Sequence, residues 1–382
     1  MGDFGMHIGL FVKDFAIGKK FSKDGLPTKS GAEFHAENHA KQLIKRGHKV
    51  SIFAKKRYWF TKARENIERI DLVRLHAPFR WLEIICRLLT THRDVDAFYI
   101  IGTPKFAVWA IIMAKLFHKP VTLALTANVE IFDKNANWRN RILASCDQYI
   151  ATSHEIGRGY CDKTGISKSQ VTILPHGLDM DKYPMPSEEM KIHNKINKLG
   201  DGTVPVIIFC ARIVEDKGIG VLLKSWPIVH AKHPEAKLIV VGGGKFDLIQ
   251  EMKEMSINND NSATIVGEVD MPQMYYQLGD IYLFPSRHEA LPTSLIEAMS
   301  SGLVPVTCDI GGCEDVVFDG KTGFRLPVDN YEAFADKINY LIEHPNERKI
   351  MANNAHELMK EYCDYSVVIE KLESKILSKM YY

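Results

Sequence analysis

Long apolar runs and closely spaced cysteine pairs are missing from this chain of 382 residues. Its longest uninterrupted apolar run is residues 106–114, whereas a transmembrane helix needs roughly 20 residues. The first residues carry no basic segment followed by a long apolar stretch, so we expect no signal peptide. The seven cysteines form no C-x2-C pair, which favours free thiols in a reducing compartment over disulfides or a zinc site. We therefore predict a cytoplasmic protein.

A strong overall charge is also missing, since the net charge is only +2, but the charges are unevenly distributed. Residues 1–180 carry 28 Lys/Arg and 17 Asp/Glu, a balance of +11, and the remaining residues carry a balance of −9. Two halves of opposite sign indicate two domains with different partners, the basic one facing something anionic.

Short β-branched runs alternate with helical stretches along the chain, which is typical of parallel α/β units. The strand-like runs before the middle of the chain are residues 7–12, 49–54, 97–101, 121–125, 148–151 and 171–174, and those after it are 204–210, 237–241, 264–266, 281–284 and 304–306. We predict an α/β fold of two Rossmann-like parallel-sheet domains, residues 1–186 and 204–364, facing a central cleft. The polar residues 187–203 are expected to form a linker.

Two basic residues follow the predicted strand at 204–210, where ligands of open parallel sheets bind. A guanidinium at Arg212 and an ammonium at Lys217, in one loop before a helix, suit a diphosphate. The alternative is a surface pair that screens the neighbouring Glu215 and Asp216.

Two glutamates eight positions apart follow the predicted strand at 281–284. Glu289 precedes a helix that Pro292 opens, and Glu297 lies within that helix. Two such carboxylates accept hydrogen bonds from a polyhydroxyl ligand, while free amides at the helix start hold an anion. The alternative is an ordinary loop acid and a solvated helix residue.

The ordered set of motifs resembles the family-4 retaining glycosyltransferases, which have the two-domain GT-B fold. The motifs that carry the resemblance are Ser30-Gly-Ala-Glu33, Arg46-Gly-His48, Ile173-Leu-Pro-His-Gly-Leu-Asp179, Ala211-Arg212 with Lys217-Gly218, Val241-Gly-Gly-Gly244, Phe284-Pro-Ser286, Glu289 to Glu297 as E-x7-E, and Gly302-Leu-Val-Pro-Val306 with Gly311-Gly312. The resemblance covers nearly the whole chain. It implies a hexosyltransferase that keeps the anomeric configuration and needs no metal or other cofactor. Residues 1–186 would bind the acceptor, residues 204–364 the nucleotide-diphospho-sugar, and a C-terminal helix in 365–382 would pack back on the first domain.

The same resemblance implies a role for each matching residue. Arg212 and Lys217 would hold the donor diphosphate, Glu289 would bond the sugar hydroxyls, and these three would be the catalytic residues. Glu297 would accept from the ribose hydroxyls. The donor-binding set would be Gly31, Arg212, Lys217, Glu289, Ala290, Leu291, Pro292, Thr293 and Glu297.

The chain departs from the family pattern at two places. Ala290 stands where the family has glycine after the first glutamate. The stretch 125–130 lacks the histidine that many members carry, so Thr126 or Asn128 is the candidate polar contact on the acceptor side.

Basic and aromatic residues are mixed at 55–64 and at 79–93. Such segments suit adsorption to an anionic bilayer, and the alternative is a solvated basic face above core aromatics. We expect a peripheral protein on the cytoplasmic side of the membrane that takes part in cell-surface glycan or glycolipid synthesis. Its acceptor is expected to be a glycan or a lipid-linked molecule, and we expect no nucleic-acid partner. The competing hypotheses are a GT-B nucleotide-sugar epimerase or phosphorylase, and a non-catalytic donor-binding partner subunit.

Overall fold

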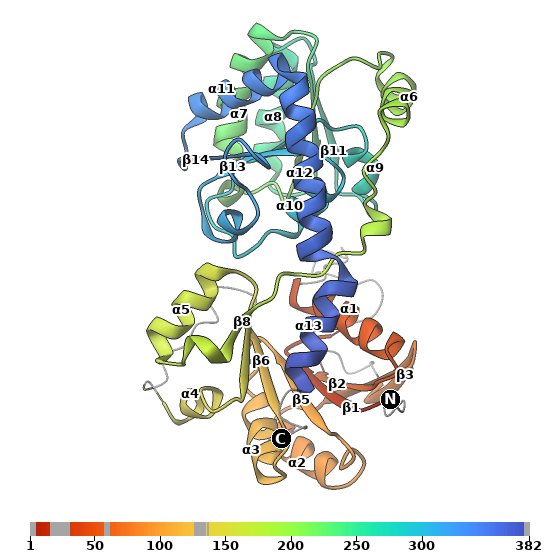
Figure 1. The fold of residues 1–382 in the computed structure, drawn as a ribbon, viewed down its shortest axis with the longest axis vertical. Coiled ribbons are helices and arrows are strands. Elements are labelled where there is room, and N and C mark those ends of the chain that lie inside the picture. The colour runs from red at the N-terminus through yellow and green to blue at the C-terminus, as the bar shows by residue number, and fades with distance from the viewer. Residues whose placement is uncertain (1–4, 16–30, 57–61, 126–134, 136, 378–382) are drawn as a thin grey trace. The chain divides into compact units, whose positions relative to one another are not determined.

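The computed structural model describes residues 5–15, 31–56, 62–125, 135 and 137–377. The chain divides into two compact units, the first formed by residues 1–177 with 365–382 and the second by residues 178–364 (Figure 1). The chain therefore passes between the units twice, once after Gly177 and once after Asp364.

The described part of the first unit contains an eight-stranded sheet in the order β3-β4-β2-β1-β5-β6-β7-β8. All neighbouring strands are parallel except β3 and β4, which are antiparallel. The strands are β1 (His7–Val12), β2 (Lys49–Lys55), β3 (Arg64–Ile67), β4 (Ile70–Leu75), β5 (Ala97–Ile101), β6 (Val121–Leu125), β7 (Gln148–Ala151) and β8 (Val171–Ile173). The predicted runs lie in β1, β2 and β5 to β8, whereas β3 and β4 were not predicted.

Helices cover both faces of this sheet, since every residue of β1, β5 and β6 is buried, as expected for inner parallel strands. The described helices are α1 (Gly31–Lys45), α2 (Arg80–Leu89), α3 (Ala107–Leu116), α4 (Trp138–Leu143), α5 (His154–Thr164) and α13 (Tyr365–Leu377). The last helix, α13, packs against α1, β5 and β6 through Val368, Leu372 and Ile376, all fully buried. His48 Nε2 lies 2.8 Å from Glu373 Oε1 and fixes this helix further.

The described part of the second unit contains a six-stranded, fully parallel sheet in the order β11-β10-β9-β12-β13-β14. Counted from the first strand of the unit, this is the doubly wound order 3-2-1-4-5-6. Its strands are β9 (Val206–Cys210), β10 (Lys237–Val241), β11 (Ala263–Gly267), β12 (Ile281–Phe284), β13 (Val304–Cys308) and β14 (Phe324–Leu326). Its helices are α6 (Glu188–Leu199), α7 (Ile219–Lys232), α8 (Phe246–Asn258), α9 (Gln273–Tyr276), α10 (Thr293–Ser300), α11 (Tyr331–Glu343) and α12 (Pro345–Cys363).

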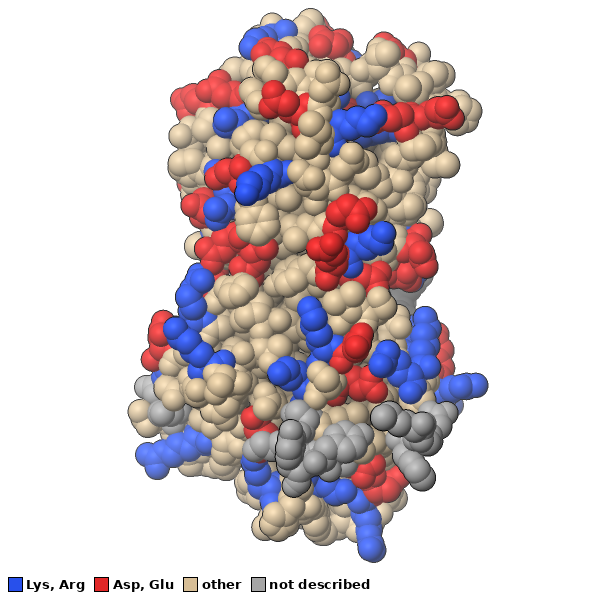
Figure 2. Space-filling view, viewed as in Figure 1, with Lys and Arg blue, Asp and Glu red and all other residues tan. Residues whose placement is uncertain are grey.

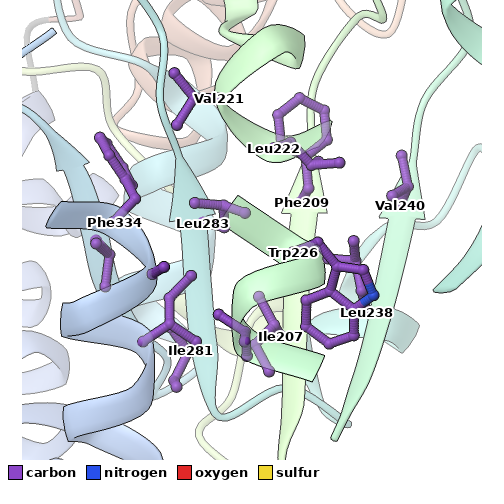
Figure 3. Packing of buried hydrophobic residues seen from close by; sticks show 14 of the residues in the cluster. Ile207, Phe209, Val221, Leu222, Trp226, Leu238, Val240, Ile281, Leu283 and Phe334 are labelled. Carbon is purple, nitrogen blue, oxygen red and sulfur yellow. The ribbon is translucent and has the colours of Figure 1, made fainter. Parts of the chain in front are cut away.

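The core of the second unit forms where α7 and α11 pack on the sheet (Figure 3). Trp226 of α7 is fully buried against the strands, and its indole Nε1 donates to Ser262 Oγ at 2.9 Å. Phe334 of α11 approaches the same sheet beside Leu283 and Ile281 of β12. The Rossmann-like fold predicted from the strand runs is thus present in both units.

The predicted boundary at residue 186 and the linker at 187–203 differ from the structure. Residues 178–186 belong to the second unit, and most of the expected linker is the helix α6. Ser187 Oγ accepts from the Met190 amide at 3.2 Å and Gly200 ends the helix with φ of 80°. A buried ion pair anchors this polar helix, since Lys195 Nζ lies 2.7 Å from Asp280 Oδ2.

Candidate active site

Lys217 and Glu289 meet at the carboxyl ends of two neighbouring strands, β9 and β12. Lys217 Nζ donates to Glu289 Oε1, and Ser286 Oγ donates to the same oxygen at 3.0 Å. The pair brings together two residues that the sequence placed in separate motifs.

A glycine allows these two loops to lie so close. Gly218 has φ of 74°, and a Cβ atom on it would lie 1.9 Å from the Pro285 carbonyl oxygen. The loops are then joined by a hydrogen bond, since the Arg287 amide donates to the Asp216 carbonyl at 2.9 Å, and Ser286 Oγ lies 3.2 Å from the same oxygen. Any side chain at position 218 would push the two loops apart.

Arg212 is exposed, and its guanidinium has no ion pair or hydrogen bond within the part of the chain that the structure describes. The backbone that carries Arg212 is held by the loop after β10. A Cβ on Gly242, whose φ is 141°, would lie 1.9 Å from the Ala211 carbonyl, and the Ile213 amide donates to the Gly243 carbonyl at 2.8 Å. Arg212 is therefore a positioned cation that is free to bind an anion.

Glu297 lies in the middle of α10 and is half-buried. Tyr183 donates its hydroxyl to Glu297 Oε1 at 2.9 Å, and Tyr276 donates to Oε2 at 3.1 Å. Burial raises the pKa of Glu297 to about 7, although both tyrosine hydrogen bonds act in the opposite direction. Glu297 is thus not a solvated helix residue. No sequence motif marked the two tyrosines, because their proximity to Glu297 arises only from the fold.

The segment from Ala290 to Thr293 leads into the start of α10. Pro292 precedes the helix with extended backbone, and the Leu295 and Ile296 amides donate to its carbonyl at 3.1 and 3.3 Å. The two amides before them, of Thr293 and Ser294, are the first of the helix and are the ones that an anion could use. The Leu291 side chain packs in the core, so only its backbone is available to a ligand. The Ala290 carbonyl is packed closely against Gly312, where a Cβ would lie only 1.8 Å away.

The remaining predicted residues belong to the first unit. Gly31 is the first residue of α1. Thr126 and Asn128 lie outside the described residues. In the described ranges, no three His, Cys, Asp or Glu side chains are grouped as a metal ion requires.

Two family models match the chain, one described as Glycosyltransferase Family 4 over residues 29–182 and one as Glycosyl transferases group 1 over residues 191–358. The chain therefore belongs to the GT-B glycosyltransferases of the family-4 type, which confirms the family and the fold predicted from the sequence.

Relatives of known name agree with this assignment. The chain is 24% identical over 299 residues to the capsular polysaccharide biosynthesis glycosyltransferase CapM of Staphylococcus aureus, covering 75% of this chain and 78% of CapM. It is 24% identical over 366 residues to the phosphatidylinositol N-acetylglucosaminyltransferase gpi3 subunit of Schizosaccharomyces pombe, covering 91% of this chain and 77% of that subunit. The fold is shared with HepE of Anabaena, solved in complex with UDP, at a TM-score of 0.75 and 18% identity, covering 98% of this chain and 100% of HepE.

Proposed function

We propose that this glycosyltransferase moves a hexosyl unit from a nucleotide-diphospho-sugar to its acceptor with retention of configuration and without a bound metal. The observation that carries this proposal is the ion pair of Lys217 with Glu289, together with Arg212 of the same loop as Lys217, whose guanidinium has no partner among the described residues. A sugar diphosphate offers an anion for the two cations and hydroxyl donors for the carboxylate, so it satisfies all three groups at once.

The three side chains divide the chemistry between them. As the bond from the anomeric carbon to the phosphate oxygen breaks, negative charge accumulates on the leaving diphosphate. Arg212 and Lys217 stabilise that charge, and the amides that open α10 add to the same field. Glu289, released from Lys217, accepts hydrogen bonds from the sugar hydroxyls and orients the ring.

Glu297 is proposed to bind the ribose hydroxyls of the donor. Each of its oxygens accepts one tyrosine hydrogen bond and retains a second lone pair for a ribose hydroxyl. The similarly folded HepE is solved with UDP, which makes UDP the first nucleotide to test.

The acceptor is proposed to be a glycan or lipid-linked molecule of cell-surface glycan or glycolipid synthesis. Two relatives act on such molecules by name, one in capsular polysaccharide biosynthesis and one on phosphatidylinositol. None of the helices in the described ranges combines the length and apolarity needed to cross a membrane. Access to a lipid-linked acceptor therefore calls for a surface of the protein that adsorbs to lipid.

The helix α2 offers such a surface. Ile84 and Leu88 face the core, but the apolar arc of the helix continues past them to Phe79 and Leu89, which are 63% and 51% exposed. Several large apolar side chains exposed next to one another are uncommon on a protein surface that contacts only water.

The exposed arc of α2 continues over two neighbouring helices, and we name the set the α2–α4 face. It consists of the exposed residues Phe79, Trp81, Leu82, Leu89, Leu116, Phe117 and Trp138. Trp109 of α3 joins it, with ring centroids 5.6 Å from Trp81 and 6.2 Å from Trp138. Exposed Arg141 lies in α4, and exposed Arg93 and Lys105 lie in the loops that follow α2 and precede α3. Figure 2 shows Lys and Arg side chains at the surface of the unit that contains these helices. Aromatic and basic groups together suit an anionic lipid surface.

The transfer reaction is tested by incubating the protein with UDP-glucose and other nucleotide-sugars, with and without membrane lipid extract as acceptor. We expect lipid-extractable product only with acceptor. A product formed from nucleotide-sugar alone would instead identify an epimerase, and donor binding without turnover would identify a non-catalytic subunit.

A further inference from the structure

The second unit contains a cavity of about 290 Å³ at the amino end of β12, whereas Glu289 follows the carboxyl end of that strand. The cavity lies between α6, the end of α10 and the start of α12. Residues that line it include Met185, Glu188, Lys191, Asp280, Gly302 and Arg348. Its volume is at the lower end of the range for small-molecule sites.

One carboxylate at the base of the cavity faces two ammonium groups. Lys191 Nζ lies 3.0 Å from Asp280 Oδ1, and Lys195 Nζ lies 2.7 Å from Oδ2. The Val206 amide also donates to Oδ2 at 2.8 Å. Asp280 therefore balances only one of the two positive charges that it binds.

Arg348, in the first turn of α12, adds a further cation. Its guanidinium donates to the Leu341 carbonyl at 2.8 Å and has no carboxylate partner among the described residues. At the rim, Lys349 and Glu188 pair at 3.2 Å and cancel each other. The charged side chains that line the cavity thus carry an excess of one positive charge. Lys195, which binds Asp280 but does not line the cavity, adds a second positive charge behind it.

The same cations act on the Asp280 carboxylate. Burial by itself would raise the pKa of Asp280, yet Lys191, Lys195 and Arg348 lower it to about 2. A partly enclosed cavity with uncompensated cations, including a guanidinium, favours an oxyanion. The start of α12 adds amide dipoles of the same sign.

We propose that this cavity binds the phosphate group of a soluble phosphate ester and so regulates donor binding. The regulatory part rests on the proposed role of Glu297 at the donor ribose. Direct contacts connect the cavity with Glu297. A Cβ on Gly302, just after α10, would lie 2.7 Å from Met185 Cγ, so Met185 packs on the end of the helix that carries Glu297. Tyr183, two residues before Met185, donates to Glu297 itself.

Calorimetric titration with inorganic phosphate and with glycerol 3-phosphate tests the binding site at constant ionic strength. We expect both to bind the wild type and the Arg212→Ala variant equally, because Arg212 lies at the donor site. Arg348→Gln should weaken binding at least tenfold, and the matched control Lys360→Gln, an exposed cation of the same helix, should not. Equal binding in Arg348→Gln and wild type, or no binding to the wild type, would overturn the proposal.

A second variant covers the case in which Arg348→Gln does not fold. Lys349→Glu changes an exposed rim residue and should also weaken phosphate binding, whereas Lys360→Glu should not. Vesicles containing phosphatidic acid form a further arm. If the protein binds these vesicles but not glycerol 3-phosphate, and Arg348→Gln abolishes the vesicle binding, the cavity binds a lipid headgroup. That result would overturn the proposal of a soluble ligand.

Regulation is measured as the change in the Kd of UDP when the cavity is saturated with glycerol 3-phosphate. We expect the Kd of UDP to change at least threefold in the wild type and in Lys360→Gln, but not in Arg348→Gln. Thermodynamic linkage then requires UDP to change the Kd of glycerol 3-phosphate by the same factor. Tyr183→Phe should bind phosphate normally but lose the change. A change that persists in Arg348→Gln would mean competition at the donor site and would overturn the regulation. If UDP does not bind at all, the donor proposal fails while the phosphate titrations still decide the cavity.

Discussion

Lys217 Nζ donates to Glu289 Oε1 across a separation of 72 residues, and the two side chains are only 18% and 15% exposed. Each group partly compensates the other's charge in a site that is shielded from water. In the proposed function, a sugar diphosphate supplies an anion for Lys217 and hydroxyl donors for Glu289. This pairing explains how a loop cation and a loop acid stay in position before substrate arrives.

Replacing Arg212 with alanine should lower kcat/KM roughly 100- to 1,000-fold, the usual effect of losing one preorganised donor to developing negative charge. The free energy of unfolding should change by less than about 0.5 kcal/mol, because the exposed guanidinium has no partner among the described residues. Steady-state kinetics and thermal unfolding measure the two effects. Lys253→Ala, which removes an exposed cation from α8, is the matched control. Wild-type turnover in Arg212→Ala would remove this residue from the phosphate site.

Glu297→Gln and Glu289→Gln should affect nucleotide binding differently. Glu297→Gln should raise the Kd of UDP about tenfold, since one charged hydrogen-bond acceptor for the ribose is lost. Glu289→Gln should leave the Kd of UDP nearly unchanged but reduce transfer, because its proposed partner is the sugar. Calorimetry with UDP alone and transfer assays separate the two roles, and an equal loss of UDP binding in both variants would contradict the assignment.

The raised pKa of Glu297 predicts a loss of stability as pH rises. Between its ordinary pKa of 4.5 and the folded value of about 7, the folded state binds more protons than the unfolded state. Stability from this group is therefore fully present below pH 4.5 and lost as pH rises through 7, with a magnitude on the order of 3 kcal/mol. Denaturant unfolding at pH 5, 6, 7 and 8 measures the slope. Glu297→Gln should flatten it, and an identical slope in the variant would show that another group titrates.

The α2–α4 face should bind anionic vesicles in a salt-dependent way. Each Lys or Arg near anionic lipid contributes about 1 kcal/mol, and salt at 0.1 M screens this attraction within about 10 Å. Leu82→Asp should release the protein from the vesicles, because it introduces a negative charge into an exposed apolar arc. Flotation with vesicles at low and high salt measures the effect, with Ile257→Asp, an exposed residue of α8, as control. Wild-type protein that fails to float at low salt would favour a soluble acceptor.

Local patterns in the sequence determined the α/β class, the positions of the inner strands and the loops that carry the site. Buried parallel strands are continuous apolar runs, and a ligand-binding loop follows directly from the end of such a run. The order of the motifs was enough to identify the family. Helix α6 was missed, because its anchoring contact is a buried ion pair of Lys195 with Asp280, which in sequence resembles solvated charge. The β3–β4 pair was also missed, since its partly exposed edge strand shows no apolar run.

Only the tertiary structure decided which partners the site residues have. Glu297 receives hydrogen bonds from Tyr183 and Tyr276, which lie 114 and 21 residues away along the chain. Such contacts depend on which strands become neighbours and on how closely glycines such as Gly218 let two loops approach. A spacing pattern describes only the neighbours of a residue a few positions away along the same helix or strand. The pKa of Glu297 and the pairing of Lys217 with Glu289 are set instead by burial and distance between remote segments, and these exist only once the sheet has formed.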